Sequence, residues 1–254
     1  MDSTIIISRF NEDVNWVKKL NSSSEIIIYN KGEKLEHSNN FKEILLPNVG
    51  RESQTWLHHI HKNYDNLNKY NIFLQGRIDD LGCMAYSKPN DYLNDLKNQS
   101  FSVSRFGLLS PLHWKDNLNI EKDIRYSESW KKKEISRSPY GFRKYAKKFL
   151  GKIPLVVATS YGGCFAVSRE AIRSHKKDFY YSLLNTVNKH INPIESHYLE
   201  RLWCYIFSKN KYLNKALIDV LKTKIERNIF QKNNFELLLN KKFVFIRTLL
   251  KSLI

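Results

Sequence analysis

The sequence of 254 residues contains few cysteines and none of the common glycine-rich site motifs. Its three cysteines, Cys83, Cys164 and Cys204, are too few and too scattered for a disulfide framework, and no CxxC pair is present to bind zinc. A reducing, cytosolic environment is therefore expected. The chain also lacks the G-x-G-x-x-G, G-x-x-x-x-G-K-[ST] and G-x-S-x-G patterns, which excludes the usual dinucleotide, P-loop and serine-hydrolase signatures.

Long apolar runs and acidic residues are also scarce. No stretch approaches the roughly 18–20 apolar residues of a membrane-spanning helix, and the N-terminal segment MDSTIIISRFNED has no features of a signal peptide. The 42 Lys and Arg residues against 25 Asp and Glu give a net charge of +17. Such an excess favours anionic partners, namely nucleic acid, acidic lipid or phosphorylated substrates. No zinc-finger, RNP or basic-zipper pattern is present, so nucleic acid is not expected as a partner.

Short apolar runs near the N-terminus predict the strands of an α/β sheet. Thr4–Ser8 (TIIIS) and Glu25–Tyr29 (EIIIY) are β-branched runs bounded by polar residues, and a helix over Asn11–Leu20 connects them. This order predicts a βαβ unit with a parallel sheet. The other predicted elements are an extended segment Phe41–Leu46, a helix Glu52–Tyr64, a strand Asn71–Gln75, a helix Pro89–Asn98, strands Leu155–Ala158 and Cys164–Val167, and helices Ser168–His175, Phe179–His190 and Glu195–Ser208.

The rest of the chain is polar or basic. Ser100–Gly151 is weakly patterned and is expected to form loops with short helices, whereas Leu213–Ile254 is predicted as a basic amphipathic helical tail. The predicted organisation is one α/β domain over residues 1–210 and the tail over residues 211–254. In the tail, Lys and Arg alternate with Leu, Ile and Phe, which suits an interfacial helix on anionic lipid. A helix docked on the domain is the alternative.

Polar residues follow the first predicted strand directly, in the segment Ser8–Asp13 (SRFNED). A strand end that opens onto a helix N-terminus presents free backbone N–H groups, which suit a nucleotide or a phosphate. The alternative interpretation is a capped helix with a solvated acidic first turn.

A pair of carboxylates, Asp79 and Asp80, follows the predicted strand Asn71–Gln75 after Gly76. Carboxylates just past the C-terminal end of a buried strand lie where open α/β sheets place their ligands. Their oxygens suit a divalent cation, which leaves coordination positions for substrate phosphates. The alternative is an exposed acidic turn.

Two further motifs lie in the second half of the chain. A glycine turn at Gly162 and Gly163 leads into a strand and allows a close backbone approach to a ligand, although a simple tight turn uses the same residues. The last predicted helix of the domain carries Glu200, Arg201 and Trp203. A partly buried glutamate beside aromatic residues is suited to act as a general base, and a structural Glu–Arg ion pair is the alternative.

Five segments of the chain resemble, in order, the recurrent segments of an uncharacterised family with fungal and bacterial members. The family segments read ARYNEDLSWL, LPNVGREGHTYLHHI, NYDNLPDYTVFLQG, GAxFAVSREAI and ERLWxxIF. In this chain they correspond to Ser8–Val17, Leu46–Ile60, Asn63–Gly76, Gly162–Ile172 and Glu200–Phe207. The resemblance covers most of Ile5–Phe207 and leaves out the loop Ser87–Lys152 and the tail after Phe207.

The chain also resembles, more weakly, glycosyltransferases of the A type. Those enzymes open with a strand ending in R-x-N-E and carry an acidic metal motif at the end of a central strand. Later they have a glycine turn, a strand similar to GCFAVSRE and an acidic helix that holds the catalytic base. The resemblance implies a single Rossmann-like α/β domain with a mixed, mostly parallel sheet flanked by helices, followed by the basic tail.

The implied activity is transfer of a sugar from a nucleotide-sugar donor to a saccharide or lipid-linked acceptor, in the assembly of a bacterial surface polysaccharide such as lipopolysaccharide or capsule. The implied location is cytoplasmic and peripheral, on the inner face of the cytoplasmic membrane, with the basic tail against anionic lipid. A non-catalytic basic protein that binds nucleic acid or a membrane is the main alternative. A metal-dependent phosphohydrolase would share the acidic pair but needs more ligands.

The resemblance assigns expected roles to individual residues. Glu200 is expected to deprotonate the acceptor hydroxyl, with inversion at the sugar carbon. Asp80, with Asp79, is expected to hold Mn²⁺ or Mg²⁺, although the usual motif is Asp-x-Asp and this chain has Ile78-Asp79-Asp80. Arginines or lysines are the alternative means of neutralising the diphosphate. The expected donor-binding residues are Arg9, Asn11, Glu12, Asp13, Asn30, Lys31, Arg51, Gln75, Gly76 and Arg77, and the expected acceptor-side residues are Gly162, Gly163, Phe165, Arg201 and Trp203.

Overall fold

The computed structural model describes residues 2–18, 20, 23–36, 40–78, 93–94, 96, 100–103, 107–109, 131–132, 134–151, 157–159 and 163–207. By its internal contacts the chain divides into two compact units, Met1–Lys209 and Asn210–Ile254. All the described residues belong to the first unit. The predicted basic tail lies outside them and stays a prediction.

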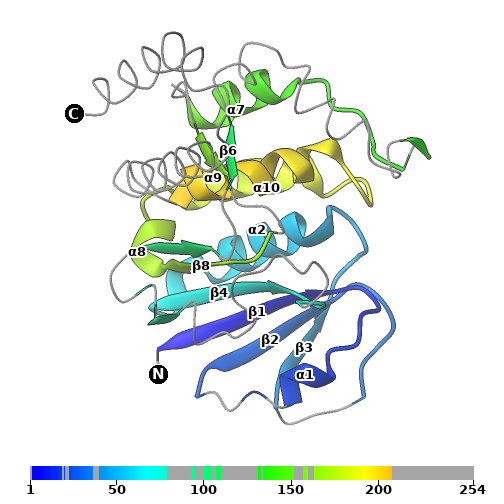
Figure 1. Ribbon diagram of the computed structural model, residues 1–254, viewed down its shortest axis with the longest axis vertical. Helices are drawn as coiled ribbons and strands as arrows, with labels where there is room; N and C mark the ends of the chain where they lie inside the picture. Colours follow the sequence, from blue (N-terminus) through cyan, green and yellow to red (C-terminus); the bar gives the residue numbers. More distant parts are fainter. Residues whose placement is uncertain are drawn as a thin grey trace, which may run out of the picture. The chain divides into compact units, whose positions relative to one another are not determined.

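A six-stranded mixed sheet forms the centre of the described unit, with the strand order β3-β2-β1-β4-β8-β5 (Figure 1). The first four of these strands are parallel to one another, and β8 runs antiparallel to both β4 and β5. A separate antiparallel pair is formed by β6 and β7. The strands are β1 (Ser3–Arg9), β2 (Glu25–Asn30), β3 (Lys42–Leu45), β4 (Tyr70–Gln75), β5 (Phe101–Val103), β6 (Gly107–Leu109), β7 (Val157–Thr159) and β8 (Phe165–Ser168). The predicted α/β class and the mixed, mostly parallel sheet are confirmed.

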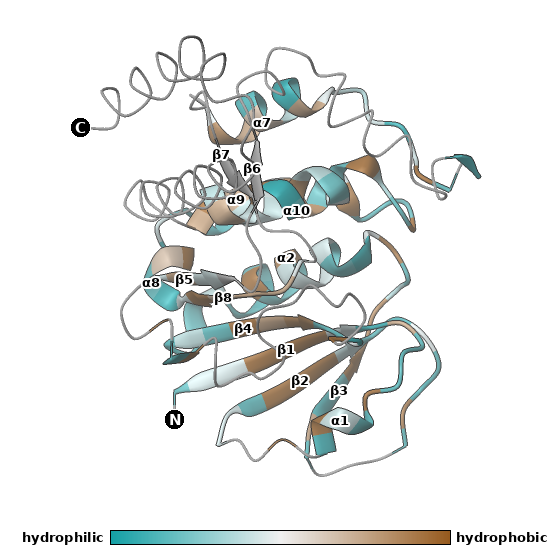
Figure 2. Ribbon diagram, viewed as in Figure 1, coloured by the Kyte–Doolittle hydropathy of each residue, from teal (hydrophilic) through white to brown (hydrophobic). Residues whose placement is uncertain are grey.

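The apolar runs form buried strands because both faces of the sheet are covered. Ile5 and Ile7 of β1 pack with Val14 and Val17 in one cluster of buried apolar residues. Successive side chains of a strand point to opposite faces, so Ser8 faces the other layer, where its hydroxyl lies 2.9 Å from that of Thr55 in α2. Figure 2 shows the hydrophobic colouring concentrated along β1, β2 and β4. Burial on both sides explains why these strands are apolar throughout.

Helix α2 packs against β1 on the Ser8 face of the sheet, α10 contacts β5, and α9 and α10 both contact α2. The helices are α1 (Asn15–Lys18), α2 (Arg51–Asn63), the 3₁₀ turn η1 (Tyr64–Asn66), α7 (Phe142–Leu150), α8 (Arg169–Ile172), α9 (Lys177–Val187) and α10 (Ile194–Phe207). Ser168 caps α8, because its hydroxyl accepts a hydrogen bond from the backbone N–H of Ala171 at 3.2 Å. No helix among the described residues is long and apolar enough to cross a membrane.

An aromatic cluster joins the sheet to α10. The ring of Phe165 in β8 lies 4.9 Å from that of Phe73, 5.5 Å from those of Phe101 and Phe207, and 5.7 Å from that of Trp203. Phe165 and Trp203 are both 0% exposed. These two residues belong to the core, so their predicted contact with an acceptor is wrong.

Two predictions of local structure differ from the structure, the first in the length of a helix and the second in two short strands that were not expected. The helix expected over Asn11–Leu20 is a single turn, α1, because polar side chains hold the residues before it in a loop. The Asp13 carboxylate accepts a hydrogen bond from the N–H of Asn15 at 2.7 Å, and the side-chain oxygen Oδ1 of Asn11 accepts one from the N–H of Glu33 at 3.0 Å. The segment Ser100–Gly151, expected as loops with short helices, contains two short strands, β5 and β6, and helix α7.

The burial of Phe165 predicts a large effect on stability. Phe165→Ala should lower the free energy of unfolding by about 3–5 kcal/mol, because it removes a fully buried ring and leaves a cavity. Phe10→Ala is the matched control, since the Phe10 ring is 46% exposed and its loss should change the free energy by less than about 1 kcal/mol. Urea denaturation of both variants measures the difference. Equal effects would contradict the placement of Phe165 in the core.

Candidate functional site

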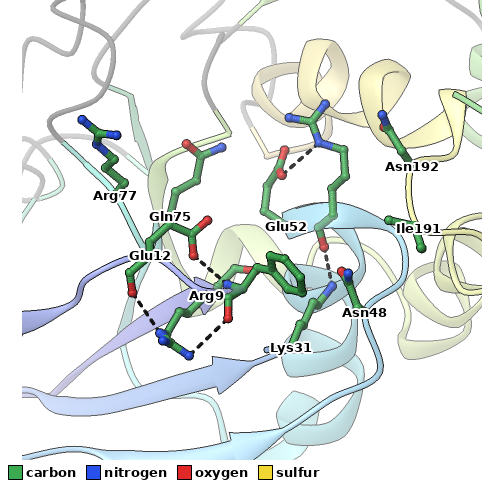
Figure 3. A pocket seen from close by; sticks show the side chains of 12 residues that line it. Arg9, Glu12, Lys31, Asn48, Glu52, Gln75, Arg77, Ile191 and Asn192 are labelled. Atoms are coloured by element: carbon green, nitrogen blue, oxygen red, sulfur yellow. Dashed lines mark hydrogen bonds and ion pairs between the residues drawn. The ribbon is translucent and has the colours of Figure 1, made fainter. Parts of the chain in front are cut away.

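A pocket of about 500 Å³ opens at the C-terminal ends of the parallel strands (Figure 3). The chain proceeds from β1 outward to β2 and β3 and then returns to β4 on the other side of β1. Open α/β sheets bind ligands at such a reversal of strand order, outside the carboxyl ends of the strands. The lining residues are Ser8, Arg9, Phe10, Glu12, Lys31, Asn48, Arg51, Glu52, Gln75, Arg77, Ile191 and Asn192.

Arg9 fixes the loops that follow β1 and β2. Its side chain is buried, and Nε donates a hydrogen bond to the carbonyl oxygen of Glu12 at 2.9 Å. Its Nη1 donates to Asn30 Oδ1 at 2.8 Å and to the carbonyl oxygen of Glu33 at 2.7 Å. Figure 3 shows the Arg9 guanidinium bonded to backbone carbonyls on its own side of the pocket. Arg9 therefore organises the site, and much of its hydrogen-bonding capacity is used by the protein itself.

The same two loops touch at Gly32. A Cβ atom added there would lie 1.8 Å from the carbonyl oxygen of Phe10, which only a glycine avoids. The N–H of Lys31 donates to the carbonyl oxygen of Arg9 at 2.8 Å. These contacts hold the backbone of Phe10 beside the start of the second loop, where the half-exposed Phe10 ring lines the pocket.

Lys31 is a buried cation in the pocket lining. Its side chain is 8% exposed, and Nζ donates to the carbonyl oxygens of Val49 at 2.6 Å and Arg51 at 2.5 Å. Burial lowers the pKa of the Lys31 ammonium from 10.5 to about 7, and the negative charge of Glu52 opposes this shift. The ammonium ties the end of β2 to the loop that leads into α2.

Helix α2 begins with two consecutive left-handed residues. Gly50 has φ of 64° and Arg51 has φ of 49°, an uncommon conformation for a residue with a side chain. A Cβ at Gly50 would lie 2.1 Å from the carbonyl oxygen of Val187, and the Gly50 N–H donates to the carbonyl oxygen of His190 at 2.7 Å. No side chain caps α2. The first turn of this helix, with its unfilled N–H groups, therefore lies beside the pocket.

The Arg51 guanidinium is held by side chains from two other elements. Its Nε lies 3.5 Å from a carboxylate oxygen of Glu52, and Nη1 lies 3.2 Å from the ring nitrogens of His197 in α10. Burial, and then the charges of Arg51 and Arg201, lower the pKa of His197 to about 3. The neutral ring has one donor and one acceptor, so it donates from Nε2 to Asn192 Oδ1 at 2.9 Å and accepts from Arg51. Figure 3 shows Glu52 and Asn192 at the same side of the pocket.

The structure brings together six of the ten predicted donor-binding residues as pocket lining: Arg9, Glu12, Lys31, Arg51, Gln75 and Arg77. The other four, Asn11, Asp13, Asn30 and Gly76, support the surrounding loops. Asn30, for example, accepts from Arg9 and donates to Glu43 Oε1 at 2.7 Å. A Cβ at Gly76 would lie 2.9 Å from Glu12 Oε2, so Gly76 lets the Glu12 side chain lie over the end of β4.

The other six lining residues were not assigned individually from the sequence, although Ser8 and Phe10 lie in the segment expected to bind a nucleotide. Ser8 and Phe10 belong to the SRFNED segment, and Asn48 and Glu52 flank Arg51 in the LPNVGRE segment, so position in these motifs could have found them. Ile191 and Asn192 come from the α9–α10 loop, far away in the sequence, where no pattern marks them. Their loop reaches the pocket through the Gly50–His190 and His197–Asn192 hydrogen bonds.

The predicted catalytic and metal residues have mixed placements. Glu200 does not line the pocket; its carboxylate lies 3.6 Å from Arg201 Nη1, the ion pair foreseen as the alternative. Its charge nevertheless contributes to the raised pKa of Arg51, after the larger contribution of Glu52. Gly163 lies against the Glu52 side chain, with φ of 66°. Asp79, Asp80 and Gly162 lie outside the described residues, within which no cluster of three or more His, Cys, Asp and Glu side chains is arranged to hold a metal ion.

Residues 5–217 match the family described as "Protein of unknown function (DUF3431)", and the chain belongs to this family. The expected membership of an uncharacterised family is thereby confirmed, whereas the resemblance to glycosyltransferases stays a prediction. No curated protein and no solved structure matches the chain.

The lowered pKa of Lys31 predicts how stability changes with pH. Above pH 7 the folded chain loses the Lys31 proton while the unfolded chain keeps it up to about pH 10.5, so the free energy of unfolding rises with pH in this range. Relative to Lys31→Met, the native chain should gain up to about 1.4 kcal/mol per pH unit between pH 7 and 8.5. Urea denaturation at several pH values measures both slopes. Parallel slopes would show that Lys31 titrates normally.

Proposed function

We propose that the pocket binds the diphosphate of a nucleotide-activated sugar and that the protein is a glycosyltransferase of the A type. The observation that carries this proposal is the gathering of Lys31, Arg51 and Arg77 with the N-terminal turn of α2 around one pocket at the reversal of strand order. Helix N-termini attract phosphate through their free N–H groups and their dipole. Guanidinium groups add bidentate hydrogen bonds to phosphate oxygens.

The charge balance of the pocket favours an anionic ligand. The lining contains the cations Lys31, Arg51 and Arg77 and two carboxylates, Glu12 and Glu52. The donors of Arg9 are largely used in hydrogen bonds to backbone carbonyls. A diphosphate that approaches Lys31 favours the charged form of the ammonium. His197, which is neutral, keeps Arg51 in place without competing for the anion.

Two exposed apolar side chains complete the pocket. Phe10 is 46% exposed and Ile191 is 64% exposed, and both line the same cavity as the cations. Aromatic faces stack on nucleobases, so a ring beside a phosphate-binding group suits a nucleotide. The volume of about 500 Å³ lies within the range of small-molecule sites.

The transfer step requires a base and charge neutralisation. The acceptor hydroxyl oxygen attacks the anomeric carbon, its proton passes to a carboxylate, and the bond between that carbon and the diphosphate oxygen breaks with inversion. Cations beside the diphosphate stabilise the charge on the departing nucleoside diphosphate. Glu200, assigned by the resemblance, and Glu52, a lining residue, are the two candidate bases.

A divalent cation belongs to the proposal as a second means of neutralising the diphosphate. Asp79 and Asp80 are the residues expected to hold it, directly after Ile78 in the sequence. When bound, Mn²⁺ or Mg²⁺ acts as a Lewis acid on phosphate oxygens. The proposed acceptor is a saccharide or lipid-linked saccharide in bacterial surface polysaccharide assembly.

Ligand-induced stabilisation tests donor binding. A nucleoside diphosphate or nucleotide-sugar at 100 times its Kd should add about 2.7 kcal/mol to the free energy of unfolding, measured by thermal shift with and without Mn²⁺. Arg51→Gln should abolish the shift because it removes the central guanidinium. Arg137→Gln, an exposed arginine that does not line the pocket, is the control and should keep the shift. If no nucleotide stabilises the chain, the non-catalytic basic binding protein becomes the better interpretation.

Hydrolysis of the nucleotide-sugar donor separates the two candidate bases without knowledge of the acceptor. Glu200→Gln should lower the rate by about 10²–10⁴-fold, the usual contribution of a general base, while the donor-induced thermal shift persists. Glu52→Gln should instead weaken the donor-induced shift, since Glu52 pairs with Arg51. Full turnover in Glu200→Gln, with loss of turnover but normal donor binding in Glu52→Gln, would reverse the assignment.

A further inference from the structure

Helix α7 separates its apolar and basic residues onto opposite faces. Phe142, Tyr145 and Ala146 are at most 1% exposed, whereas its four cations, Arg143, Lys144, Lys147 and Lys148, are exposed. With about 100° of rotation per residue, these cations span an arc of about 140°. Figure 2 shows both hydrophilic and hydrophobic colouring on this helix. The four cations are called the basic face of α7 below.

The buried face fixes α7 to the rest of the unit. The ring of Tyr198 in α10 lies 5.2 Å from that of Phe142 and 5.5 Å from that of Tyr145. The hydroxyl of Tyr145 lies 3.0 Å from that of Thr186 in α9. The basic face is therefore presented from a helix that is packed in place.

Two of the four cations lie at the unfavourable end of the helix. Arg143 and Lys144 are in the first turn, where the helix dipole favours acidic residues, whereas Lys147 and Lys148 are in the last turn, where it favours cations. Lys147 follows Arg143 by four residues and Lys148 follows Lys144 by four, so like charges are neighbours on the surface. No acidic residue occurs in the sequence between Glu134 and Glu170. A face selected only for contact with water needs no such one-sided charge.

We propose that the basic face of α7 binds an anionic lipid surface. A bilayer presents a continuous plane of negative charge, and each Lys or Arg near it strengthens binding about fivefold without a fixed partner. Proteins that bind nucleic acid also use Ser, Thr, Asn and Gln to position phosphates, and α7 contains none of them. The Lys148 ammonium lies over the rings of Tyr140 and Phe149, 4.5 Å and 5.5 Å from their centres, and such aromatic groups favour the interfacial region.

The basic face is connected to the wall of the pocket. The N–H of Ser136 donates to the carbonyl oxygen of Asn192 at 3.0 Å, and the N–H of Ile194 donates to the carbonyl oxygen of Ser136 at 3.3 Å. The Tyr198 hydroxyl donates to the carbonyl oxygen of Tyr140, just before α7, at 3.4 Å. Asn192 lines the pocket. A membrane bound at α7 is thus linked, through the segment that precedes this helix, to the loop that contributes Asn192 to the pocket.

Co-sedimentation of the full chain with lipid vesicles tests the proposal. The wild type should bind vesicles containing about one third phosphatidylserine, with affinity falling as salt rises, and should not bind phosphatidylcholine alone. Arg143→Gln, Lys144→Gln and Lys147→Gln combined should weaken binding about a hundredfold, from three contributions of about fivefold. Lys148 is kept because it donates to the Tyr140 hydroxyl.

Two controls separate the basic face from general charge and from misfolding. Lys18→Gln, Lys42→Gln and Lys176→Gln combined remove the same charge from exposed positions of other elements and should weaken binding at most about twofold. Arg143→Lys, Lys144→Arg and Lys147→Arg combined keep the charge and should bind as the wild type does.

Equal losses of vesicle binding in both neutralised variants would overturn the proposal. Unchanged vesicle binding in the neutralised α7 variant would also overturn it. So would a neutralised α7 variant that loses binding to duplex RNA but keeps its binding to vesicles. None of these outcomes depends on nucleotide binding, so this test is independent of the proposed transferase activity.

Discussion

The buried ammonium of Lys31 is the interaction on which the candidate site depends. It donates to the carbonyl oxygens of Val49, in the loop before α2, and of Arg51, the first residue of α2. The chain enters this helix through two left-handed residues, Gly50 and Arg51. Without a partner for these carbonyls, the strained backbone at Arg51 would be free to relax. The ammonium thus joins the end of a central strand to the start of a helix. Its cost is the burial of a charge, and this cost lowers the pKa of the ammonium to about 7.

Two groups of hydrogen bonds adjoin Lys31, one toward the sheet and one toward the helices. Toward the sheet, Arg9 and Asn30 bond the loops after β1 and β2 to each other. Toward the helices, Arg51 is oriented by Glu52 and by the neutral ring of His197, which bonds in turn to Asn192. Cations, a helix terminus and two apolar side chains therefore meet in one pocket although they come from five separate segments of the chain. The proposed binding of a nucleotide rests on this convergence.

The sequence predicted the parallel strands because their β-branched runs have one physical explanation, burial on both faces of a sheet. Six pocket residues were among those that the resemblance implied, and most of them lie at or just after the ends of parallel strands, which meet at one edge of the sheet. The sequence could not show that the donors of the Arg9 guanidinium are largely used by backbone carbonyls. The spacing of residues in a sequence does not reveal whether a side chain already has its hydrogen-bond partners within the protein. Phe165 and Trp203 were misassigned for a related reason: an aromatic residue near a glycine turn has the same sequence signature in a core as in a binding site.

Gly32 has a consequence for how the site can change over time. Any side chain at this position would overlap the carbonyl oxygen of Phe10, so a substitution requires the backbone after β1 to move as well. Phe10 carries the aromatic ring of the pocket, and Lys31 is the residue next to Gly32. A substitution of Gly32 therefore alters both loops at once: it moves the backbone that carries the Phe10 ring, and it does so directly beside the buried cation.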